Sequence, residues 1–244
     1  MVAPRLSIVI PAFNEALRIG KALEGVEKYI AAQPFRTELI LVDDGSTDST
    51  PDLFRQFQSR WPSTRILQNE INRGKGFSVR RGVLAAQGDF ILFTDADLSA
   101  PIEEAGKLLQ AIESSAADAA VGSRALDRKL IGVHQPWPRE YAGRCFNLFV
   151  RLFTGLNIHD TQCGFKLFRR ATTRKAFELQ RVERFGFDPE VLFLIKRLGG
   201  KIVEVPVRWN DNPATKVHFL RDSTRMFLDL VALRWRFSGR RDSA

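Results

Sequence analysis

Short apolar runs alternate with longer stretches of helical periodicity through the first half of the chain. The runs at 6–10, 39–42, 66–67 and 90–93 predict buried strands. Between the first two, apolar residues recur three or four positions apart over 17–26, which is typical of one face of a helix. This alternation predicts an α/β domain with a mostly parallel central sheet and helices on both faces.

Two carboxylates follow the predicted strand 90–93, in the sequence Asp95-Ala96-Asp97. In an open α/β sheet, ligands bind at the carboxyl ends of the strands. Two carboxylates one residue apart repel each other, and a hard divalent ion shared with substrate phosphates would relieve that repulsion. The alternative is a pair of solvated turn acids that cap a helix begun by Pro101. The segment alone leaves both interpretations open.

Polar loops also follow the other predicted strands. The first strand ends at Pro11 and leads into the loop 12–15, while the second leads into 43–48, which supplies a turn and a helix cap. The third is followed by 72–76, where glycines allow close backbone approach and cations can face a phosphate. Glycine with lysine is also ordinary turn chemistry, so this loop carries little weight alone.

Several of these motifs, taken in their order along the chain, resemble the nucleotide-sugar-binding half of the inverting family-2 glycosyltransferases with the GT-A fold. The resemblance rests on 11–15, 43–50, 72–76, 95–97 and Gly122-Ser123-Arg124.

The second half extends the resemblance to the dolichyl-phosphate β-glucosyltransferase branch of that family. The segments concerned are Asp160–Lys166, Val182–Glu190 and Val205–Asn210. The resemblance implies a Rossmann-like GT-A fold with a mixed, mostly parallel sheet in a single domain, 1–244. Within it, about 1–125 would bind the nucleotide sugar and about 126–244 would bind the acceptor.

The resemblance also assigns the donor-binding residues. They are Pro11, Phe13, Glu15, Val42, Asp44, Lys75, Asp95, Ala96 and Asp97. It implies a divalent metal, Mg²⁺ or Mn²⁺, held by Asp97 and Asp95, with Asp97 as the more direct ligand. For the acceptor it implies Arg124, Gln162, Lys166 and Lys216.

The implied catalytic residues are Asp97, Arg124, Lys216, Asp188 and Glu190. Asp188 and Glu190 occupy the region where family members with hydroxyl acceptors place a base. A polyprenyl phosphate is already largely ionised at neutral pH, because its second pKa is about 6, and needs no strong base. Because Pro189 follows it, Asp188 can also be a helix cap.

The implied reaction is transfer of a hexose, with inversion, from a nucleotide sugar to a polyprenyl phosphate. Glucose from UDP-glucose is favoured over mannose from GDP-mannose. Related mannosyltransferases often place a metal-binding glutamine two residues after the acidic motif, where this chain has Ser99. A more distant alternative is a catalytically silent, membrane-associated nucleotide-sugar-binding protein, but every carboxylate required for the chemistry is present.

Charge and amphipathic pattern suggest a peripheral contact with a membrane. With 37 Lys and Arg against 28 Asp and Glu, the surface should attract anions. No nucleic-acid module is visible, so nucleic acid is not expected as a partner. The segment 141–153 has a narrow polar stripe of Arg144, Asn147 and Arg151, and 221–237 has a second apolar face. Either helix would lie in a membrane interface or pack on the core.

Residues near the C-terminus fit the same contact, since Arg236, Arg240 and Arg241 with Trp235 suit anionic lipid. Charges interrupt every apolar run well before the roughly 20 residues needed to span a bilayer. The first apolar run is better used as a strand than as a signal peptide. The two cysteines lie in no disulfide or zinc spacing, which predicts a reducing, cytoplasmic-face location.

Overall fold

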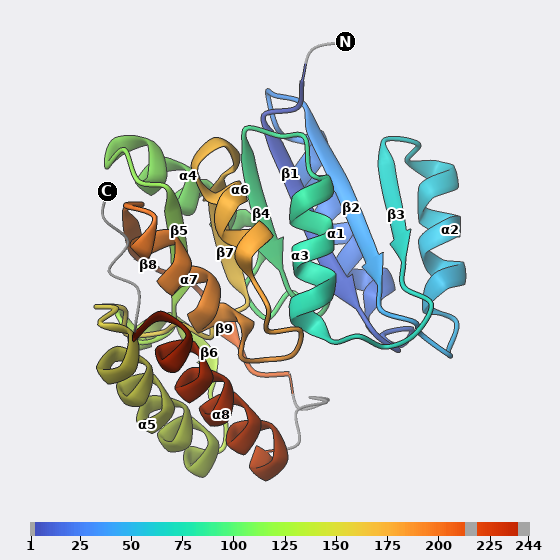
Figure 1. Cartoon of the computed structure of the whole chain (residues 1–244). Coiled ribbons are helices and arrows are strands. Elements are labelled where there is room, and N and C mark those ends of the chain that lie inside the picture. The colour runs from blue at the N-terminus through green and yellow to red at the C-terminus, as the bar shows by residue number, and fades with distance from the viewer. Residues whose placement is uncertain (1–2, 213–218, 239–244) are drawn as a thin grey trace.

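The computed structural model describes residues 3–212 and 219–238 and shows an α/β fold around a seven-stranded sheet (Figure 1). The strand order is β3-β2-β1-β4-β7-β5-β8. Strand β7 runs antiparallel to both of its neighbours, whereas the other pairs are parallel. The prediction of a mixed, mostly parallel sheet is therefore confirmed. The strands are β1 Leu6–Ala12, β2 Thr37–Asp43, β3 Thr64–Gln68, β4 Phe90–Thr94, β5 Ala119–Ser123, β7 Phe165–Arg169 and β8 Ile202–Pro206.

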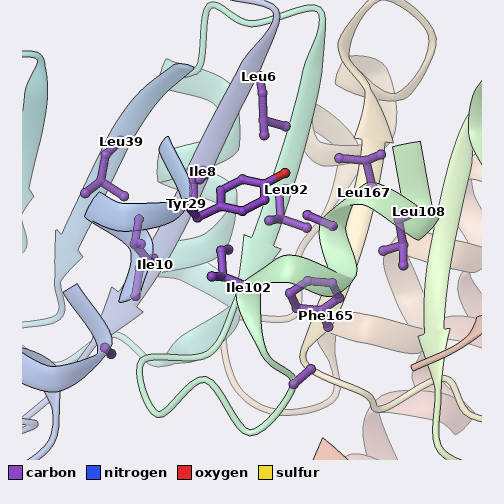
Figure 2. Packing of buried hydrophobic residues seen from close by; sticks show 14 of the residues in the cluster. Leu6, Ile8, Ile10, Tyr29, Leu39, Leu92, Ile102, Leu108, Phe165 and Leu167 are labelled. Atoms are coloured by element: carbon purple, nitrogen blue, oxygen red, sulfur yellow. The ribbon is translucent and has the colours of Figure 1, made fainter. Parts of the chain in front are cut away.

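Helices cover both faces of this sheet, as predicted (Figure 1). Successive strand residues point to opposite faces, so Ile8 and Ile10 join one buried layer while Val9 joins the other. The first layer packs on α1 and α4 (Figure 2), and the second packs on α3, α6 and α7. Burial on both faces explains why these strands are continuous apolar runs. The helices are α1 Ile19–Ala31, α2 Thr50–Arg60, α3 Lys75–Ala85, α4 Ala105–Ser114, α6 Arg170–Leu179 and α7 Phe187–Arg197.

Two longer helices, α5 (Trp137–Thr154) and α8 (Phe219–Ser238), lie side by side at one end of the molecule (Figure 1). The Phe149 and Phe227 rings meet edge to face, with their centres 5.6 Å apart. Beneath them lies a third apolar cluster. Near this end, β6 (Ile131–Val133) pairs with β9 (Trp209–Asn210). Within the described ranges, no helix combines the length and the apolar character needed to cross a membrane.

The loops at the carboxyl ends of β1 and β2 are fixed to one another. Asn14 has a left-handed backbone, with φ of 53°. Its side-chain oxygen accepts a hydrogen bond from Thr47 N at 2.8 Å, and its own N–H donates to Ser46 Oγ at 2.9 Å. Gly45 also has positive φ, and a Cβ there would lie 2.6 Å from the carbonyl carbon of Ile71. The strand-end loops therefore form one rigid surface above the sheet.

The close approach of α3 to the sheet gives a test of the fold. A Cβ added to Gly82 would lie 2.4 Å from Val9 Cγ1 and 3.0 Å from Val42 Cγ2. We expect Gly82→Ala to lower the free energy of unfolding by about 1–3 kcal/mol through overpacking. Gly106→Ala in α4, where a Cβ meets nothing within 4 Å, should instead raise it by about 0.5–1 kcal/mol. Urea unfolding measures both, and equal effects would contradict the packing.

Candidate active site

Asp95 follows β4 and contacts two other elements. Its backbone N–H donates to Gly164 O at 3.1 Å. Its carboxylate lies 2.6 Å from Lys75 Nζ, at the start of α3. A Cβ at Gly164 would lie only 2.0 Å from Asp95 Oδ2, so a larger residue there would displace the Asp95 carboxylate. The loop that precedes β7 is thereby held directly against the acidic motif.

Lys75 is a fixed positive charge beside these carboxylates. Burial works to lower its pKa, but the charges of Asp95 and Asp188 outweigh burial, and the pKa of Lys75 is raised. The ammonium group also lies 5.3 Å from the centre of the Phe93 ring. Lys75 therefore stays charged at neutral pH.

Asp97 sits in a tight turn whose next residue, Leu98, has φ of 47°. Its Oδ1 accepts a hydrogen bond from Ser99 N at 3.0 Å, and its Oδ2 lies 3.7 Å from Arg18 Nη1. Arg18 also forms a bidentate pair with Glu15, with both distances 2.7 Å. Among the described residues, the buried Arg18 Nη1 has no hydrogen-bond acceptor.

Asp188 and Lys166 form a buried ion pair. Lys166 Nζ lies 2.5 Å from Asp188 Oδ1 and donates to Cys163 O at 2.5 Å. Burial raises the pKa of Asp188 and outweighs the opposing charges of Lys166 and Lys75. Helix α7 has Gly186 at its N-cap, so Asp188 lies in the first turn and makes no cap hydrogen bond. Lys166 is 1% exposed, and so it supports Asp188 from within the core.

Arg124 is held by Asp160 on the opposite wall. Its Nε and Nη2 donate to the Asp160 carboxylate at 2.7 and 2.8 Å, and its backbone N–H donates at 3.0 Å. Burial works to raise the pKa of Asp160, but Arg124 outweighs burial and the pKa is lowered. The guanidinium carbon lies 5.2 Å from the centre of the Trp209 ring. The position of the Arg124 charge is therefore well defined.

These groups line a cleft of about 230 Å³ between the two halves of the chain. The predicted site residues among its lining are Lys75, Asp95, Asp97, Arg124, Gln162 and Asp188. Sequence reasoning missed a second group, which includes Gln135, Arg139, Phe146, Asp211 and Met226. No motif marks these residues, because they reach the cleft only through the placement of α5, α8 and the loop after β9.

The other predicted donor residues lie in or around the strand ends. Pro11 and Val42 are buried in the ends of β1 and β2, and Phe13 is partly exposed in the following loop. The Asp44 carboxylate accepts hydrogen bonds from Asn69 Nδ2 at 2.7 Å, Arg73 N at 3.0 Å and Gly74 N at 2.8 Å. Asp44 therefore holds the loop that precedes Lys75.

Glu190, one of the predicted catalytic residues, does not line the cleft. Glu190 is 2% exposed and faces Arg236 and the segment before α7. Burial raises its pKa although two backbone N–H groups and Arg236 oppose this. Lys216 lies outside the described residues.

Two polar side chains on the long helices lie differently from the predicted pattern. Asn147, predicted to share a narrow polar stripe with Arg144 and Arg151, is buried, and its Nδ2 donates to Ile158 O and His159 O at 2.8 Å. Arg236, expected to face lipid, turns inward to Glu190. Both polar side chains stabilise neighbouring backbone, which helical periodicity alone does not reveal.

The acidic motif fits a divalent metal. Among the described residues, no three His, Cys, Asp or Glu side chains cluster as a protein-only metal cage. Mg²⁺ and similar hard ions are usually bound by one or two carboxylates together with substrate phosphates. Asp95 and Asp97 supply such oxygens at the cleft, and Lys75 already balances part of their charge.

Comparison with known proteins identifies the family. Residues 7–177, more than half of the chain, match the family model described as Glycosyl transferase family 2. The chain belongs to glycosyl transferase family 2. It is 34% identical to the dolichyl-phosphate beta-glucosyltransferase of Dictyostelium discoideum, covering 95% of this chain and 74% of that protein. It is also 36% identical to the Saccharomyces cerevisiae protein of the same name, over 94% of this chain and 74% of that protein.

Solved structures show the same GT-A fold. Glucosyl-3-phosphoglycerate synthase from Mycobacterium tuberculosis, in complex with UDP, has a TM-score of 0.68 at 18% identity and covers 95% of this chain and 80% of its own. A mannosyltransferase from Pyrobaculum calidifontis, in complex with GDP-Man and Mn²⁺, has a TM-score of 0.65 at 19% identity. The match covers 97% of this chain and 65% of the mannosyltransferase. The predicted fold class and family are thereby confirmed.

The Arg124–Asp160 pair makes stability depend on pH. Because folding lowers the pKa of Asp160 below 3.8, the pair stabilises the fold above that pH and its contribution is lost as the pH falls through the lower folded value. Asp160→Asn should lower the free energy of unfolding by roughly 2–3 kcal/mol at pH 7. The difference from the wild type should shrink towards pH 3. Urea unfolding from pH 7 to pH 3 measures this.

The exposed Asp52–Arg55 pair supplies the matched control. Asp52→Asn should change the free energy of unfolding by less than about 0.5 kcal/mol at any pH. A deficit in Asp160→Asn that stays constant down to pH 3 would show that the charge of Asp160 is not the source of the stabilisation.

Proposed function

We propose that this glycosyltransferase moves glucose from UDP-glucose onto a polyprenyl phosphate, with inversion at the anomeric carbon. The observation that carries the proposal is the identity of 34–36% to dolichyl-phosphate beta-glucosyltransferases over nearly the whole chain, acceptor half included. The cleft supports it, because cations and carboxylates from both halves of the chain face the same space.

The donor diphosphate would lie near Asp95, Asp97 and Lys75. Asp97 and Asp95 would hold Mg²⁺ or Mn²⁺, which supplies positive charge that stabilises the departing UDP. Lys75 adds a second positive charge at a fixed position. Arg18, whose buried Nη1 lies 3.7 Å from Asp97, would orient that carboxylate.

On the acceptor side, a phosphate oxygen would attack the anomeric carbon as the bond from that carbon to the UDP oxygen breaks. The acceptor is largely ionised at neutral pH, so no strong base is required. Arg124 and Gln162 would orient the phosphate from the opposite wall. Asp188 would contribute negative charge facing the positive charge that develops on the sugar ring. No described feature favours mannose, since the GDP-Man neighbour resembles this chain in fold alone.

The surface beside the cleft suits a lipid acceptor. One face of α5 packs on the core through Asn147 and Val150, whereas Leu148 and Leu152 on another face are 54% and 71% exposed. Among the side chains that the structure describes on α5 and α8, the exposed large apolar residues are Trp137, Tyr141, Leu148, Phe149, Leu152, Phe227, Leu228 and Trp235. We propose that this surface rests on a membrane, as a peripheral contact on its cytoplasmic face.

The central test is a transfer assay with a short-chain polyprenyl phosphate, comparing radiolabelled UDP-glucose with GDP-mannose. We expect lipid-soluble label from UDP-glucose alone. Asp97→Asn should reduce transfer by about 10²-fold or more, because the metal loses a ligand. Asp89→Asn, an exposed residue just before β4 at its other end, should leave transfer unchanged. Full activity in Asp97→Asn would refute the metal assignment, and label from GDP-mannose would refute the donor.

The membrane contact is tested by sedimentation with vesicles that contain phosphatidylserine. Leu152→Glu and Trp235→Glu should each reduce vesicle binding by about tenfold, because each removes a large apolar side chain from the interface. Leu198→Glu, at an exposed position after α7, should bind as the wild type does. Transfer to a water-soluble, short-chain acceptor should remain within about twofold for all three variants. Equal binding by all variants would place the contact elsewhere.

A further inference from the structure

Glu190 joins α8 to the segment between α6 and α7. Its carboxylate accepts hydrogen bonds from Arg181 N at 3.0 Å and Val182 N at 2.7 Å, and from Arg236 Nη1 at 2.9 Å. Arg236 Nη2 also donates to Leu179 O at 2.8 Å. The Glu190 side chain is 2% exposed, whereas the Arg236 side chain is 21% exposed, so the carboxylate is the buried partner of the pair. The last turns of α8 are thereby tied to the backbone of 179–182.

This segment, in turn, packs against the first turn of α3, which begins at Lys75. Phe77 N donates to Glu183 O at 2.9 Å, and Gln180 Nε2 donates to Gly76 O at 2.9 Å. A Cβ at Gly74 would lie 2.6 Å from Glu183 O, and one at Gly76 would lie 2.6 Å from Val182 O. The backbone of 182–183 therefore sets the position of 74–77. The two backbones meet so closely at Gly74 and Gly76 that a side chain at either position would clash.

The start of α3 and the loop before it are also connected to the acidic end of the cleft. Arg73 N and Gly74 N donate to the Asp44 carboxylate, and Lys75 Nζ lies 2.6 Å from Asp95. A shift of 182–183 would thus move the cation that faces the donor diphosphate. A continuous set of contacts runs from α8, through Glu190 and the segment before α7, to Lys75.

We propose that Glu190 and Arg236 are positioning residues for donor binding, which hold the segment 179–183 against 74–77 and so fix Lys75 for the diphosphate. This inference rests on the proposed function, because it takes the donor to be a nucleoside diphosphate sugar. It replaces the sequence-based role of Glu190 as a base. It also makes the affinity for the donor depend on the contact between α8 and Glu190.

The test is calorimetric titration of UDP in the presence of Mn²⁺, together with transfer kinetics, for wild type, Glu190→Gln, Arg236→Met and the double variant. Each single change should raise the Kd for UDP and the KM for the donor by about 5- to 20-fold. The KM for the acceptor and kcat should stay within about twofold. The double variant should resemble either single variant, because both disrupt one interaction.

Two further variants separate positioning from general loss of structure. Arg236→Lys keeps the charge and should recover part of the UDP affinity lost in Arg236→Met. Arg234→Met, at an exposed position on the same helix, should bind UDP as the wild type does. Should the buried variants fail to fold by circular dichroism, Glu183→Gln tests the same path from the surface, where Glu183 pairs with Arg73, and should raise the Kd about 2- to 5-fold.

The outcomes distinguish this coupling from the proposed function. A wild-type protein that fails to bind UDP would overturn the proposed donor, and this inference with it. Wild-type UDP binding with an unchanged Kd in folded Glu190→Gln and Arg236→Met would overturn the coupling alone. A fall in kcat at unchanged donor affinity would also overturn it, because that pattern would place Glu190 in the chemical step.

Discussion

The cleft depends on an alternation of charge at the carboxyl end of β4. Asp95 and Asp188 approach one another because Lys75 interacts with both, and Lys166 supports Asp188 from within the core. Buried carboxylates without such partners would carry a large desolvation cost. The glycine at 164 belongs to the same constraint, since a Cβ there would collide with Asp95. The site is therefore built as one electrostatic unit, in which each charge has a partner from a different element.

The antiparallel strand β7 makes this unit possible. By entering the sheet between β4 and β5, it brings residues from the second half of the chain to the strand ends of the first half. Lys166 lies on β7, and the loop before that strand supplies Asp160, Gln162 and Gly164. Donor and acceptor groups can thus face the same cleft although they are far apart in sequence. Strands from both halves of the chain share one sheet, so the donor and acceptor sides of the cleft are joined by core strands.

The sequence was sufficient for the parts of the structure that depend on local pattern. Apolar runs located β1, β2, β3 and β4, and the acidic residues predicted after β2 and β4 are at the strand ends as expected. The sequence was insufficient to predict polar contacts between residues that are far apart along the chain. Glu190 lies near Asp188 in sequence but bonds to Arg236, 46 residues away, and Asn147 is turned inward to loop carbonyls. Helical periodicity cannot distinguish such buried polar contacts from a solvated stripe, because both need only one polar position per turn.

The Lys166–Asp188 pair bears on the kind of acceptor the cleft suits. A general base must gain and lose a proton in each cycle, and burial raises the pKa of Asp188 in the direction that helps it do so. Lys166, at 2.5 Å, and Lys75 oppose that rise without reversing it. An acceptor that arrives already ionised, such as a phosphate, does not require Asp188 to take up a proton. With such an acceptor, the ionised form of Asp188 can stabilise the positive charge that develops on the sugar ring.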